Sequence, residues 1–384
     1  MNLNRIVHIG PFPQSVECIQ GGVEASVFGL AKAQRASYEV HVFDVPRIGG
    51  SRIVENIGGV AVHRFCNQGG RQFAAGRQVI MMSKEIQALQ PDVCHIHGTS
   101  LFAWLMYREL KEMRLPVMVT VHGLVMVEKW NALKKGFSTK KLFQYLYQGW
   151  VEKRFLSQLP MAIVDTEYVK GRVNQYSIRR KPVMHVVPQG IDEAFFSLKC
   201  SKESRMILSV GAIGERKGHL ITLKAFELAK TKGMDAHLVI VGVVADKQYL
   251  DRLQNAIAQS EFSGQVTLYT DVSEETLKQL YEKAHLFVLH SEEESQGIVF
   301  AEAMATGLPV VATQVGGVPW VVGHGKNGLL SAFGEIELFA EHIQCLMSNA
   351  PLWQSMSDAS SEMAETYHWH IISDRINTLY HSIC

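Results

Sequence analysis

The chain has 384 residues, of which 47% are apolar and 20% are charged, and its formal net charge is +1. This length exceeds one ordinary hydrophobic core and fits two domains of roughly 150–200 residues each. The balanced charge excludes a protein that binds nucleic acid through a generally basic surface, so any charged partner must be recognised locally.

In the first half, short apolar runs predict strands over residues 5–10, 38–43, 60–65, 93–97, 117–122 and 162–165. In the second half they predict strands over 206–210, 237–242, 266–269, 286–290 and 309–312. Helical patterns lie between them, over 23–36, 76–90, 101–113, 220–232, 249–260 and 274–284. Many of the runs are continuous Val/Ile/Leu stretches, which are typical of parallel strands buried on both faces. The alternation predicts an α/β protein built from βαβ units.

The strand–helix order restarts near residue 205. Before it, the stretch 181–192 contains two prolines and a Gly-Ile-Asp turn and is the best hinge candidate, and 199–205 reads as a surface linker. We expect two Rossmann-like domains, 1–189 and 190–365, and a last helix, 366–384, that crosses back to the first domain. Two such sheets facing each other predict a deep cleft between the domains that holds the ligand site.

The most informative segment is 291–313, which follows the predicted strand 286–290. Glu294 lies in a loop, Gly297 stands where a helix begins, and Glu302 lies about one turn into that helix, 298–306. Backbone N–H groups at such a helix start form an anion site that suits a diphosphate. The acidic run 292–294 could alternatively be a solvated surface, but the helix start and Glu302 favour a functional site.

These residues resemble the glutamate pair of the retaining glycosyltransferases of family four, which have the GT-B fold. The segment Ala-Met-Ala-x-Gly-x-Pro-Val-Val-Ala follows Glu302 as it does in that family. The similarity extends over nearly the whole chain through shorter motifs at 21–24, 120–123, 188–192, 316–319 and 327–330.

The resemblance implies a role for each matching residue. Glu302 would hold the ribose hydroxyls of the nucleotide, and Glu294 would contact the donor sugar near the reacting carbon. The backbone around Gly297, Ile298 and Val299 would bind the diphosphate.

In the first domain, His122 would lie across the cleft near the sugar and the acceptor. Gly21 and Gly22 would let the first loop approach the phosphates closely, because a side chain would block that approach. Of the two histidines on the buried strand 93–97, alternation suggests that one, His95 or His97, faces inward.

Cations are expected just after the first strand of the second half, in the segment 210–218 that contains Gly211. Lys217 matches the family lysine, and Arg216 is the candidate for the charge of an arginine that the family often has at the position of Ala212. Such groups would stabilise the negative charge that grows on the leaving diphosphate. A further departure is Gln296, where the family often has an aromatic residue.

The resemblance therefore implies a hexosyltransferase-type enzyme that retains anomeric configuration, with Glu294, His122, Lys217 and Arg216 as catalytic residues. The donor would be a UDP- or GDP-linked sugar, and the pathway would be bacterial surface polysaccharide, lipopolysaccharide or glycolipid synthesis. The sequence contains no Asp-x-Asp metal anchor, so we expect no cofactor and no metal. Two alternatives stay open, a nucleotide-sugar epimerase and a non-catalytic subunit that binds a nucleotide sugar.

The stretch 129–154 mixes lysines with aromatic residues, which suits an anionic bilayer surface or a lipid-diphosphate acceptor. A packed helix with solvated lysines explains the same pattern equally well.

The cysteines lack a Cys-x-x-Cys pair or metal-ligand spacing, and we expect free thiols in a reducing compartment. They are Cys18, Cys66, Cys94, Cys200, Cys345 and Cys384. The first residues are too polar for a signal peptide, and no run of about 18 apolar residues could span a membrane. The sequence thus predicts a cytoplasmic protein.

Overall fold

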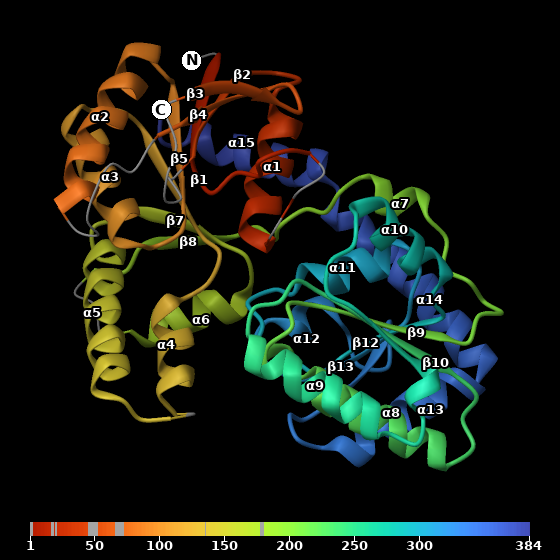
Figure 1. The fold of residues 1–384 in the computed structure, drawn as a ribbon. Helices are drawn as coiled ribbons and strands as arrows, with labels where there is room; N and C mark the ends of the chain where they lie inside the picture. The colour runs from red at the N-terminus through yellow and green to blue at the C-terminus, as the bar shows by residue number, and fades with distance from the viewer. Residues whose placement is uncertain are drawn as a thin grey trace. The chain divides into compact units, whose positions relative to one another are not determined.

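The computed structural model describes residues 3–16, 19, 21–44, 53–65, 73–134, 136–176 and 180–384. Cys18 and Cys66 lie outside these residues, and the other four cysteines are free thiols. The chain divides into two compact units. Unit 1 comprises Met1–Gly190 and Trp369–Cys384, and unit 2 comprises Ile191–His368. Figure 1 shows both units with their helices and strands labelled.

The sheet of unit 1 has eight strands in the order β3-β4-β2-β1-β5-β6-β7-β8. All neighbouring strands run parallel except β3 and β4, which pair antiparallel at one edge. The strands are β1 Arg5–Gly10, β2 Glu39–Asp44, β3 Ile53–Ile57, β4 Val60–Arg64, β5 Val93–His97, β6 Val117–Val121, β7 Met161–Val164 and β8 Val183–Val186. The helices are α1 Gly22–Gln34, α2 Phe73–Leu89, α3 Leu101–Glu112, α4 Val125–Lys134, α5 Thr139–Leu156, α6 Glu167–Gln175 and α15 Trp369–His381.

The sheet of unit 2 has six parallel strands in the order β11-β10-β9-β12-β13-β14. The strands are β9 Met206–Val210, β10 His237–Val241, β11 Val266–Tyr269, β12 Leu286–Leu289, β13 Val310–Thr313 and β14 Gly328–Ser331. The α-helices are α7 Ala194–Ser197, α8 His219–Thr231, α9 Lys247–Gln259, α10 Glu274–Lys283, α11 Ile298–Ala305, α12 Val318–Val321, α13 Ile336–Ser348 and α14 Ala350–Ala364. Short 3-10 turns are η1 Glu215–Lys217, η2 Ser263–Gln265 and η3 Glu365–Tyr367.

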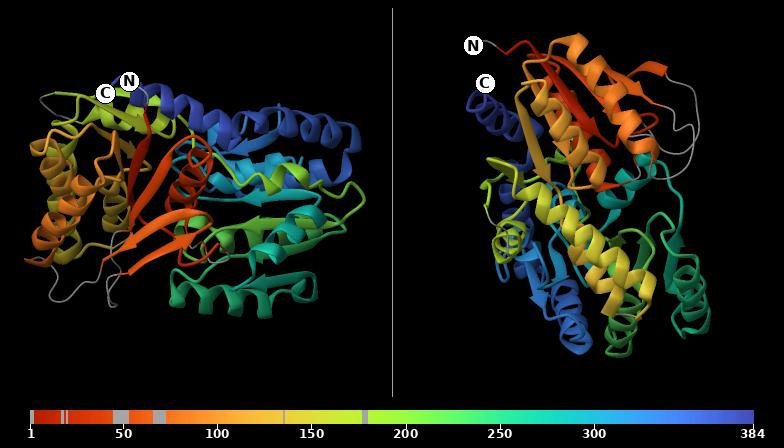
Figure 2. Two further views of the ribbon diagram at one scale, coloured as in Figure 1. Left: turned by 90° about the horizontal axis from the view of Figure 1, so that it is seen from above. Right: turned by 90° about the vertical axis from the view of Figure 1, so that its left-hand side faces the viewer.

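Each sheet has helices on both faces, as Figures 1 and 2 show. The sequence of the central strand β12 is continuously apolar because both of its faces are buried. Leu286 and Val288 enter one hydrophobic cluster, and Phe287 and Leu289 enter the cluster on the opposite face. Because all four side chains leave water, the strand shows no polar alternation, and the predicted parallel α/β architecture is confirmed.

Within the predicted hinge stretch 181–192, Val183–Val186 form β8 and pair with β7, and the division between the two units falls after Gly190. Sequence reasoning missed β8. Sequence reasoning also missed β3 and β14. All three missed strands lie at an edge of their sheet, and β3 and β8 bury few of their side chains, so they lack the continuous apolar run of a central strand.

The last helix, α15, packs against α1 within unit 1. Trp369 approaches Gly29 so closely that a Cβ there would lie 2.2 Å from its indole ring. Gln34 Nε2 also donates a hydrogen bond to Asn377 Oδ1 at 2.8 Å. The chain therefore returns after unit 2 to complete the fold of its first half. Among the described residues, no helix is both long enough and apolar enough to cross a membrane.

Candidate active site

The carboxylate of Glu294 is the centre of a charged cluster at the carboxyl ends of the unit 2 strands. Lys217 Nζ lies 2.5 Å from Glu294 Oε1, and Arg216 Nη1 lies 3.3 Å from Oε2. Ser291 Oγ donates a third hydrogen bond to Oε1, at 2.8 Å. Arg216 and Lys217 are adjacent in η1, which follows β9, whereas Glu294 follows β12, the neighbouring strand. The fold thus brings Glu294 into contact with Lys217 and Arg216, which precede it in the chain by 77 and 78 positions.

The backbone holds the Glu294 loop in place. Gly317 N–H donates to the carbonyl oxygen of Glu294 at 2.8 Å, and Glu292 N–H donates to the carbonyl of Arg216 at 2.8 Å. Thr313 Oγ1 donates to the carbonyl of Ser291 at 2.6 Å. Both ends of the loop are therefore tied to neighbouring segments, which restricts the position of the carboxylate.

The electrostatic balance of this cluster favours an anion. Burial alone would raise the pKa of the Glu294 carboxyl, but Lys217 and Arg216 outweigh it and hold that pKa below its ordinary value. Two cations therefore face one carboxylate. The Lys217 side chain is 11% exposed, whereas that of Arg216 is 49% exposed. The guanidinium of Arg216 is therefore accessible to an anion that approaches from the solvent.

The helix α11 begins next to this carboxylate. Its N-cap residue, Gly297, has a φ of +79°, and a Cβ there would lie 2.6 Å from the Phe300 ring. Only glycine adopts this left-handed geometry without strain. No side chain caps the helix, so the first N–H groups, including those of Ile298 and Val299, are directed out of its start. Both predicted anion-binding features, the cations and the helix start, thus adjoin Glu294.

Glu302 lies one turn further along α11 and has a different environment. Tyr281 Oη, on α10, donates a hydrogen bond to Glu302 Oε2 at 2.8 Å. Burial, reinforced by the negative charges of Asp192 and Glu274, raises the pKa of Glu302 to about 7, against the lowering effect of that hydrogen bond. Lys217 also acts on the Glu302 carboxyl and lowers its pKa, which shows that the two glutamates share one electrostatic site.

Two further predicted donor residues border the cluster. Gly211 follows β9, and a Cβ there would lie 3.1 Å from Cδ of Lys217, so glycine gives the lysine room. Gln296 is buried in the Glu294 loop, with 1% of its surface exposed. The structure thus places every predicted site residue of the second half around one group of strand ends.

Gly21 and Gly22, in unit 1, precede and begin α1. Nothing described lies within 4 Å of a Cβ built on either residue. Gly21 has a φ of 178°, an extended conformation open to any residue. The fold of unit 1 therefore does not require glycine here, and the predicted approach of a ligand stays a prediction.

His122 follows β6 and is 8% exposed. Its Nε2 lies 3.0 Å from His97 Nδ1, and its Nδ1 lies 3.5 Å from Asp165 Oδ2. The expectation that one of His95 and His97 faces inward is wrong. Residues two apart in a strand share a face, and both rings are buried and stack with centroids 4.2 Å apart.

Sequence reasoning missed Tyr281 and Ser291, which hold Glu302 and Glu294. Ser291 directly follows the predicted strand 286–290, and this position was an available signal. Tyr281 lies in an ordinary helical pattern 21 positions from Glu302, so no local signal could have identified it.

Chemically, the cluster offers a fixed carboxylate, two cations and a helix start, together with a second carboxyl group one helical turn away. Such a set can bind a polyanion and stabilise charge that develops on it. It has the features of an active site for a reaction with an anionic leaving group.

Models of known families match both halves of the chain. Residues 20–195 match the model described as Glycosyltransferase Family 4, and residues 190–363 match Glycosyl transferases group 1. Together they extend over most of the sequence. The chain therefore belongs to the family of glycosyltransferases that these two models describe.

Curated relatives are distant but numerous. The sulfoquinovosyl transferase SQD2 of Arabidopsis thaliana is 25% identical over 78% of this chain, although the chain spans 58% of that protein's length. The D-inositol 3-phosphate glycosyltransferase of Corynebacterium diphtheriae is 22% identical over 97% of the chain and 92% of its own length.

Solved structures confirm the GT-B fold. The sucrose-phosphate synthase of Thermosynechococcus elongatus superposes with a TM-score of 0.77 at 19% identity, covering 99% of this chain and 98% of that one. The Anabaena protein HepE, solved in complex with UDP and glucose, gives a TM-score of 0.74 at 19% identity and covers 99% and 100%. At this level of identity the likeness establishes the fold.

Proposed function

We propose that this protein is a retaining glycosyltransferase that moves a hexose from a UDP- or GDP-linked donor to an acceptor hydroxyl. The observation that carries the proposal is the contact of one buried carboxylate, Glu294, with both Lys217 and Arg216 beside the start of α11. A nucleotide diphosphate supplies the anion that this surplus positive charge favours. The complex of HepE with UDP and glucose supports the choice of donor class.

In the proposed reaction, the bond between the anomeric carbon and the diphosphate oxygen breaks while the acceptor oxygen bonds to that carbon on the same face. The acceptor's proton passes to the leaving phosphate. Lys217, Arg216 and the N–H groups near Gly297 stabilise the negative charge on the diphosphate, so the proposed mechanism requires no metal. Glu294 positions the donor sugar, and Glu302 accepts hydrogen bonds from the ribose hydroxyls.

In unit 1, the proposal assigns His122 to the sugar and the acceptor, and Gly21 and Gly22 to the phosphates. The acceptor that we propose is a saccharide or lipid-linked intermediate of bacterial surface polysaccharide, lipopolysaccharide or glycolipid synthesis. Among relatives, the name sulfoquinovosyl transferase specifies a transferred sugar, whereas the name D-inositol 3-phosphate glycosyltransferase specifies an inositol phosphate.

Nucleotide binding is testable by thermal unfolding with a panel of nucleoside diphosphates and their sugars, in the presence of a chelator. A ligand at 100 times its Kd should stabilise the protein by roughly 2.7 kcal/mol. We expect one nucleotide to stabilise the wild type, and Glu302→Ala to lose that effect. Glu341→Ala, which removes an exposed ion-pair partner of Lys232, is the matched control.

If no nucleotide stabilises the wild type, the donor site is misassigned. If one binds but no sugar is transferred to any of a broad set of acceptors, the chain is a non-catalytic nucleotide-sugar-binding subunit. Conversion of the donor sugar without an acceptor would instead identify an epimerase.

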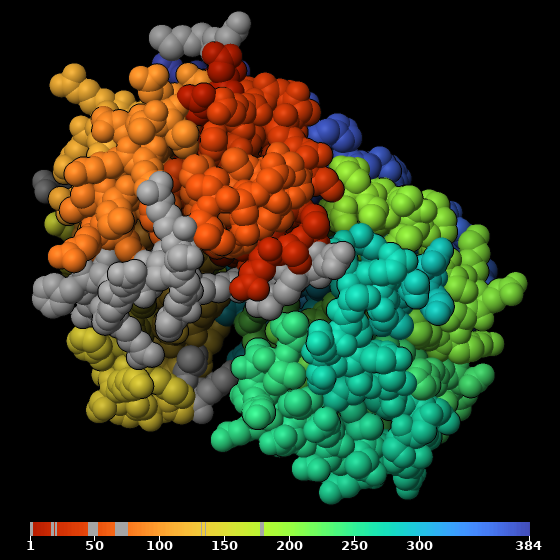
Figure 3. Space-filling view, turned by 45° about the horizontal axis from the view of Figure 1, so that its top comes forward, coloured from red at the N-terminus to blue at the C-terminus, as the bar shows by residue number. Residues whose placement is uncertain are grey.

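We also propose that unit 1 lies at the cytoplasmic face of the plasma membrane through α4 and α5. Large apolar side chains in α5 and just before it face solvent, with Phe137 75%, Phe143 70%, Leu146 58% and Trp150 55% exposed. Figure 3 shows this stretch, in yellow, at the surface of unit 1. Exposed aromatic side chains are costly in water and gain free energy at a lipid interface.

The lysines of this stretch favour an anionic lipid surface. Lys129 and Lys140 line a hollow of about 370 Å³ together with Phe143 and Tyr147. Lys134 and Lys141 lie in the same stretch, and each lysine near an anionic surface contributes about 1 kcal/mol. An anionic bilayer satisfies both the apolar and the charged groups.

Co-sedimentation with vesicles tests the membrane proposal. We expect binding to vesicles rich in anionic lipid at low salt, little binding to neutral vesicles, and loss of binding in a Phe143→Ser/Trp150→Ser double variant. A variant of Val183, which is 61% exposed on the edge strand β8, is the control. Equal sedimentation with both vesicle types, or none with either, would contradict the proposal.

A further inference from the structure

Among the described residues, the hydroxyl of Tyr281 is the one side-chain donor in hydrogen-bond contact with the Glu302 carboxylate. Tyr281 Oη lies 2.8 Å from Glu302 Oε2, and the alternative acceptor, the carbonyl oxygen of Val299, lies 3.5 Å away. A phenol carries a single proton, and 2.8 Å is an ordinary length for a hydrogen bond between two oxygens. The proton therefore points to the carboxylate.

Two aromatic contacts hold the ring of Tyr281 in place. The ring is fully buried and lies parallel to that of Phe287, with centroids 5.9 Å apart and an interplanar angle of 4°. The ring of Phe195 meets it edge-on, at 5.1 Å and 83°. Because the ring is packed in two directions, its hydroxyl is a fixed point against which the side chain of Glu302, on the neighbouring helix α11, is held.

The two oxygens of the Glu302 carboxylate have different surroundings. Oε2 accepts from Tyr281, whereas the described residues provide no hydrogen bond to Oε1. The residue is half-buried, and Oε1 is not among the described polar atoms that are both enclosed and without a partner. Oε1 is therefore open to a hydroxyl group of a ligand, for which a carboxylate oxygen is a good acceptor.

The nearest acidic neighbours of Glu302 are neutralised by a different cation. Burial is the main cause of the raised pKa of Glu302, and the negative charges of Asp192 and Glu274 add to it. Lys278 Nζ lies 2.9 Å from Asp192 Oδ2 and 2.5 Å from Glu274 Oε1. This ammonium group is therefore engaged by the two acids rather than by Glu302.

The remaining cation near Glu302 is engaged elsewhere as well. Lys217 lowers the pKa of Glu302, but its ammonium group contacts Glu294 at 2.5 Å. The hydrogen bond from Tyr281 has the larger lowering effect on that pKa. Both the orientation and the ionisation of the Glu302 carboxylate thus depend mainly on one buried hydroxyl.

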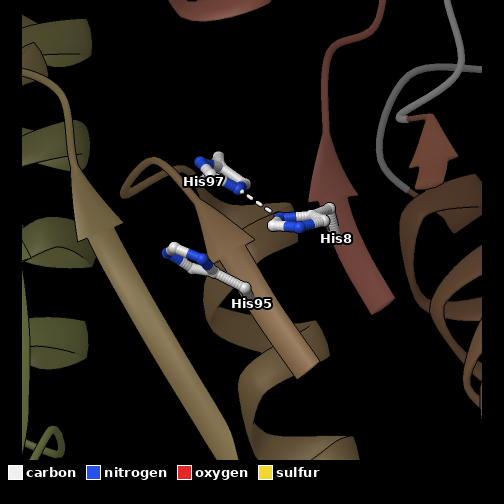
Figure 4. A group of neighbouring side chains, drawn as sticks. All are labelled: His8, His95 and His97. Atoms are coloured by element: carbon white, nitrogen blue, oxygen red, sulfur yellow. Dashed lines mark hydrogen bonds between the residues drawn. The ribbon is translucent and has the colours of Figure 1, made fainter. Parts of the chain in front are cut away.

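A buried tyrosine beside a titratable group is not by itself a ligand site, as unit 1 shows. Tyr380 Oη lies 2.6 Å from Nδ1 of His95, and the other nitrogen of that ring lies 2.7 Å from Thr120 Oγ1. Figure 4 shows His95 in its buried group with His8 and His97. Both nitrogens of His95 have partners within the unit, whereas the unit 2 carboxylate keeps one oxygen open.

We propose that Tyr281 is a positioning residue of the nucleotide site, which holds Oε2 of Glu302 so that Oε1 accepts a hydrogen bond from a ribose hydroxyl and the site selects ribonucleotides over deoxyribonucleotides. The inference rests on the proposed assignment of Glu302 to the ribose and adds the group that orients it. A carboxylate that is held in one orientation and kept ionised accepts a stronger hydrogen bond than one that rotates or takes up a proton.

Calorimetric binding of UDP and GDP, and of their 2′-deoxy and 3′-deoxy counterparts, tests the inference without turnover. We expect the wild type to bind one ribonucleotide roughly 10- to 100-fold more tightly than at least one of its deoxy counterparts, the usual effect of a hydrogen bond to a charged group. Tyr281→Phe keeps the ring and removes only the hydroxyl, and it should reduce this preference by about 10-fold. Thermal unfolding without ligand verifies that each variant is folded.

The controls separate the hydroxyl from its surroundings. Tyr380→Phe also removes a buried hydroxyl that contacts a titratable side chain, and it should leave the preference unchanged. Glu302→Gln should reduce the preference by itself. Adding Tyr281→Phe to Glu302→Gln should cause no further loss of preference, because both residues act through one carboxylate.

The pH dependence of binding distinguishes positioning from packing. A nucleotide sugar has no terminal phosphate that titrates at about pH 6, so a change in its affinity near neutral pH reports the protein. The affinity of the wild type should rise with pH as Glu302 ionises, through its pKa of about 7. Removing the Tyr281 hydroxyl removes an effect that lowers this pKa, so Tyr281→Phe should move the rise to higher pH.

If Tyr281→Phe binds ribonucleotides and deoxyribonucleotides in the wild-type ratio, or keeps the wild-type pH midpoint, the inference is overturned and Tyr281 only packs the core. A wild type that binds nucleotides without preferring the ribose hydroxyls would overturn both the inference and the assignment of Glu302 to the ribose. Absence of any nucleotide binding by the wild type would contradict the proposed function itself, and the inference with it.

Discussion

The two units use buried polar groups at their strand ends in opposite ways. In unit 2, Lys217 and Arg216 both contact the Glu294 carboxylate, and the second carboxyl group of the site, Glu302, has a pKa raised to about 7. In unit 1, the rings of His8, His97 and His122 contact one another in turn, and His8 also contacts the side-chain oxygen of Gln34, so most of their nitrogens meet partners within the unit. The comparison teaches that burial of ionisable groups does not by itself identify a ligand site. An unbalanced charge does so more directly.

The largest expected effect comes from removing the carboxylate that balances the unit 2 cluster. Glu294→Ala leaves Lys217 buried without its partner, and loss of one member of a buried ion pair typically costs about 3–5 kcal/mol. Urea unfolding should show this loss, and a bound nucleoside diphosphate should restore part of it. Glu341→Ala, at an exposed pair, should change the free energy of unfolding by less than about 1 kcal/mol. If Glu294→Ala and Glu341→Ala lowered the free energy of unfolding equally, the buried pair would not differ from the exposed pair as we expect.

Removing the buried cation tests the proposed charge stabilisation. Lys217→Ala should lower kcat by roughly 100- to 1,000-fold, the usual result when one preorganised group that stabilises transition-state charge is lost. Arg216→Ala should have a smaller effect, because half of its side chain is exposed to solvent. Steady-state kinetics with the donor found by thermal unfolding measures both. An unchanged kcat in Lys217→Ala would remove this residue from the mechanism.

The two glycine positions should respond differently to alanine. At Gly297, the positive φ and the nearby Phe300 ring make a Cβ unfavourable, and we expect destabilisation by about 1–2 kcal/mol. At Gly21, the extended backbone and open surroundings admit a Cβ, but Gly21 is the N-cap of α1, where glycine is preferred to alanine, so the two effects oppose each other and we expect a change of less than about 1 kcal/mol. Thermal unfolding measures both. Gly21→Ala should nevertheless weaken donor binding, and unchanged affinity would remove the proposed phosphate contact.

The last prediction concerns pH. The pKa of Glu302 is raised from an ordinary 4.5 to about 7, so the folded chain holds this proton more tightly than the unfolded chain. Its contribution to stability is therefore complete below about pH 4.5 and is lost as the pH rises through about 7. Urea unfolding across this range should show wild type losing stability relative to Glu302→Gln. A constant difference between the two would contradict the raised pKa.

Much of the fold and of the unit 2 site could be predicted from sequence because the signals are local. Continuous apolar runs reveal parallel strands since both faces of each strand are buried, and the order of Glu294, Gly297 and Glu302 identifies a loop followed by a helix start. Lys217 and Arg216 were placed at a strand end for the same reason. The roles assigned to these residues in catalysis stay predictions.

Tertiary structure alone decided which distant side chains meet. Tyr281 reaches Glu302 from another helix, and Asp165 meets His122 because β7 lies beside β6 in the sheet. Residue type and local periodicity determine which element forms, but the order of strands in a sheet determines which element ends become neighbours. The charge balance of Glu294 and the contacts among His8, His97 and His122 depend on that order, and so they could be known only from the folded chain.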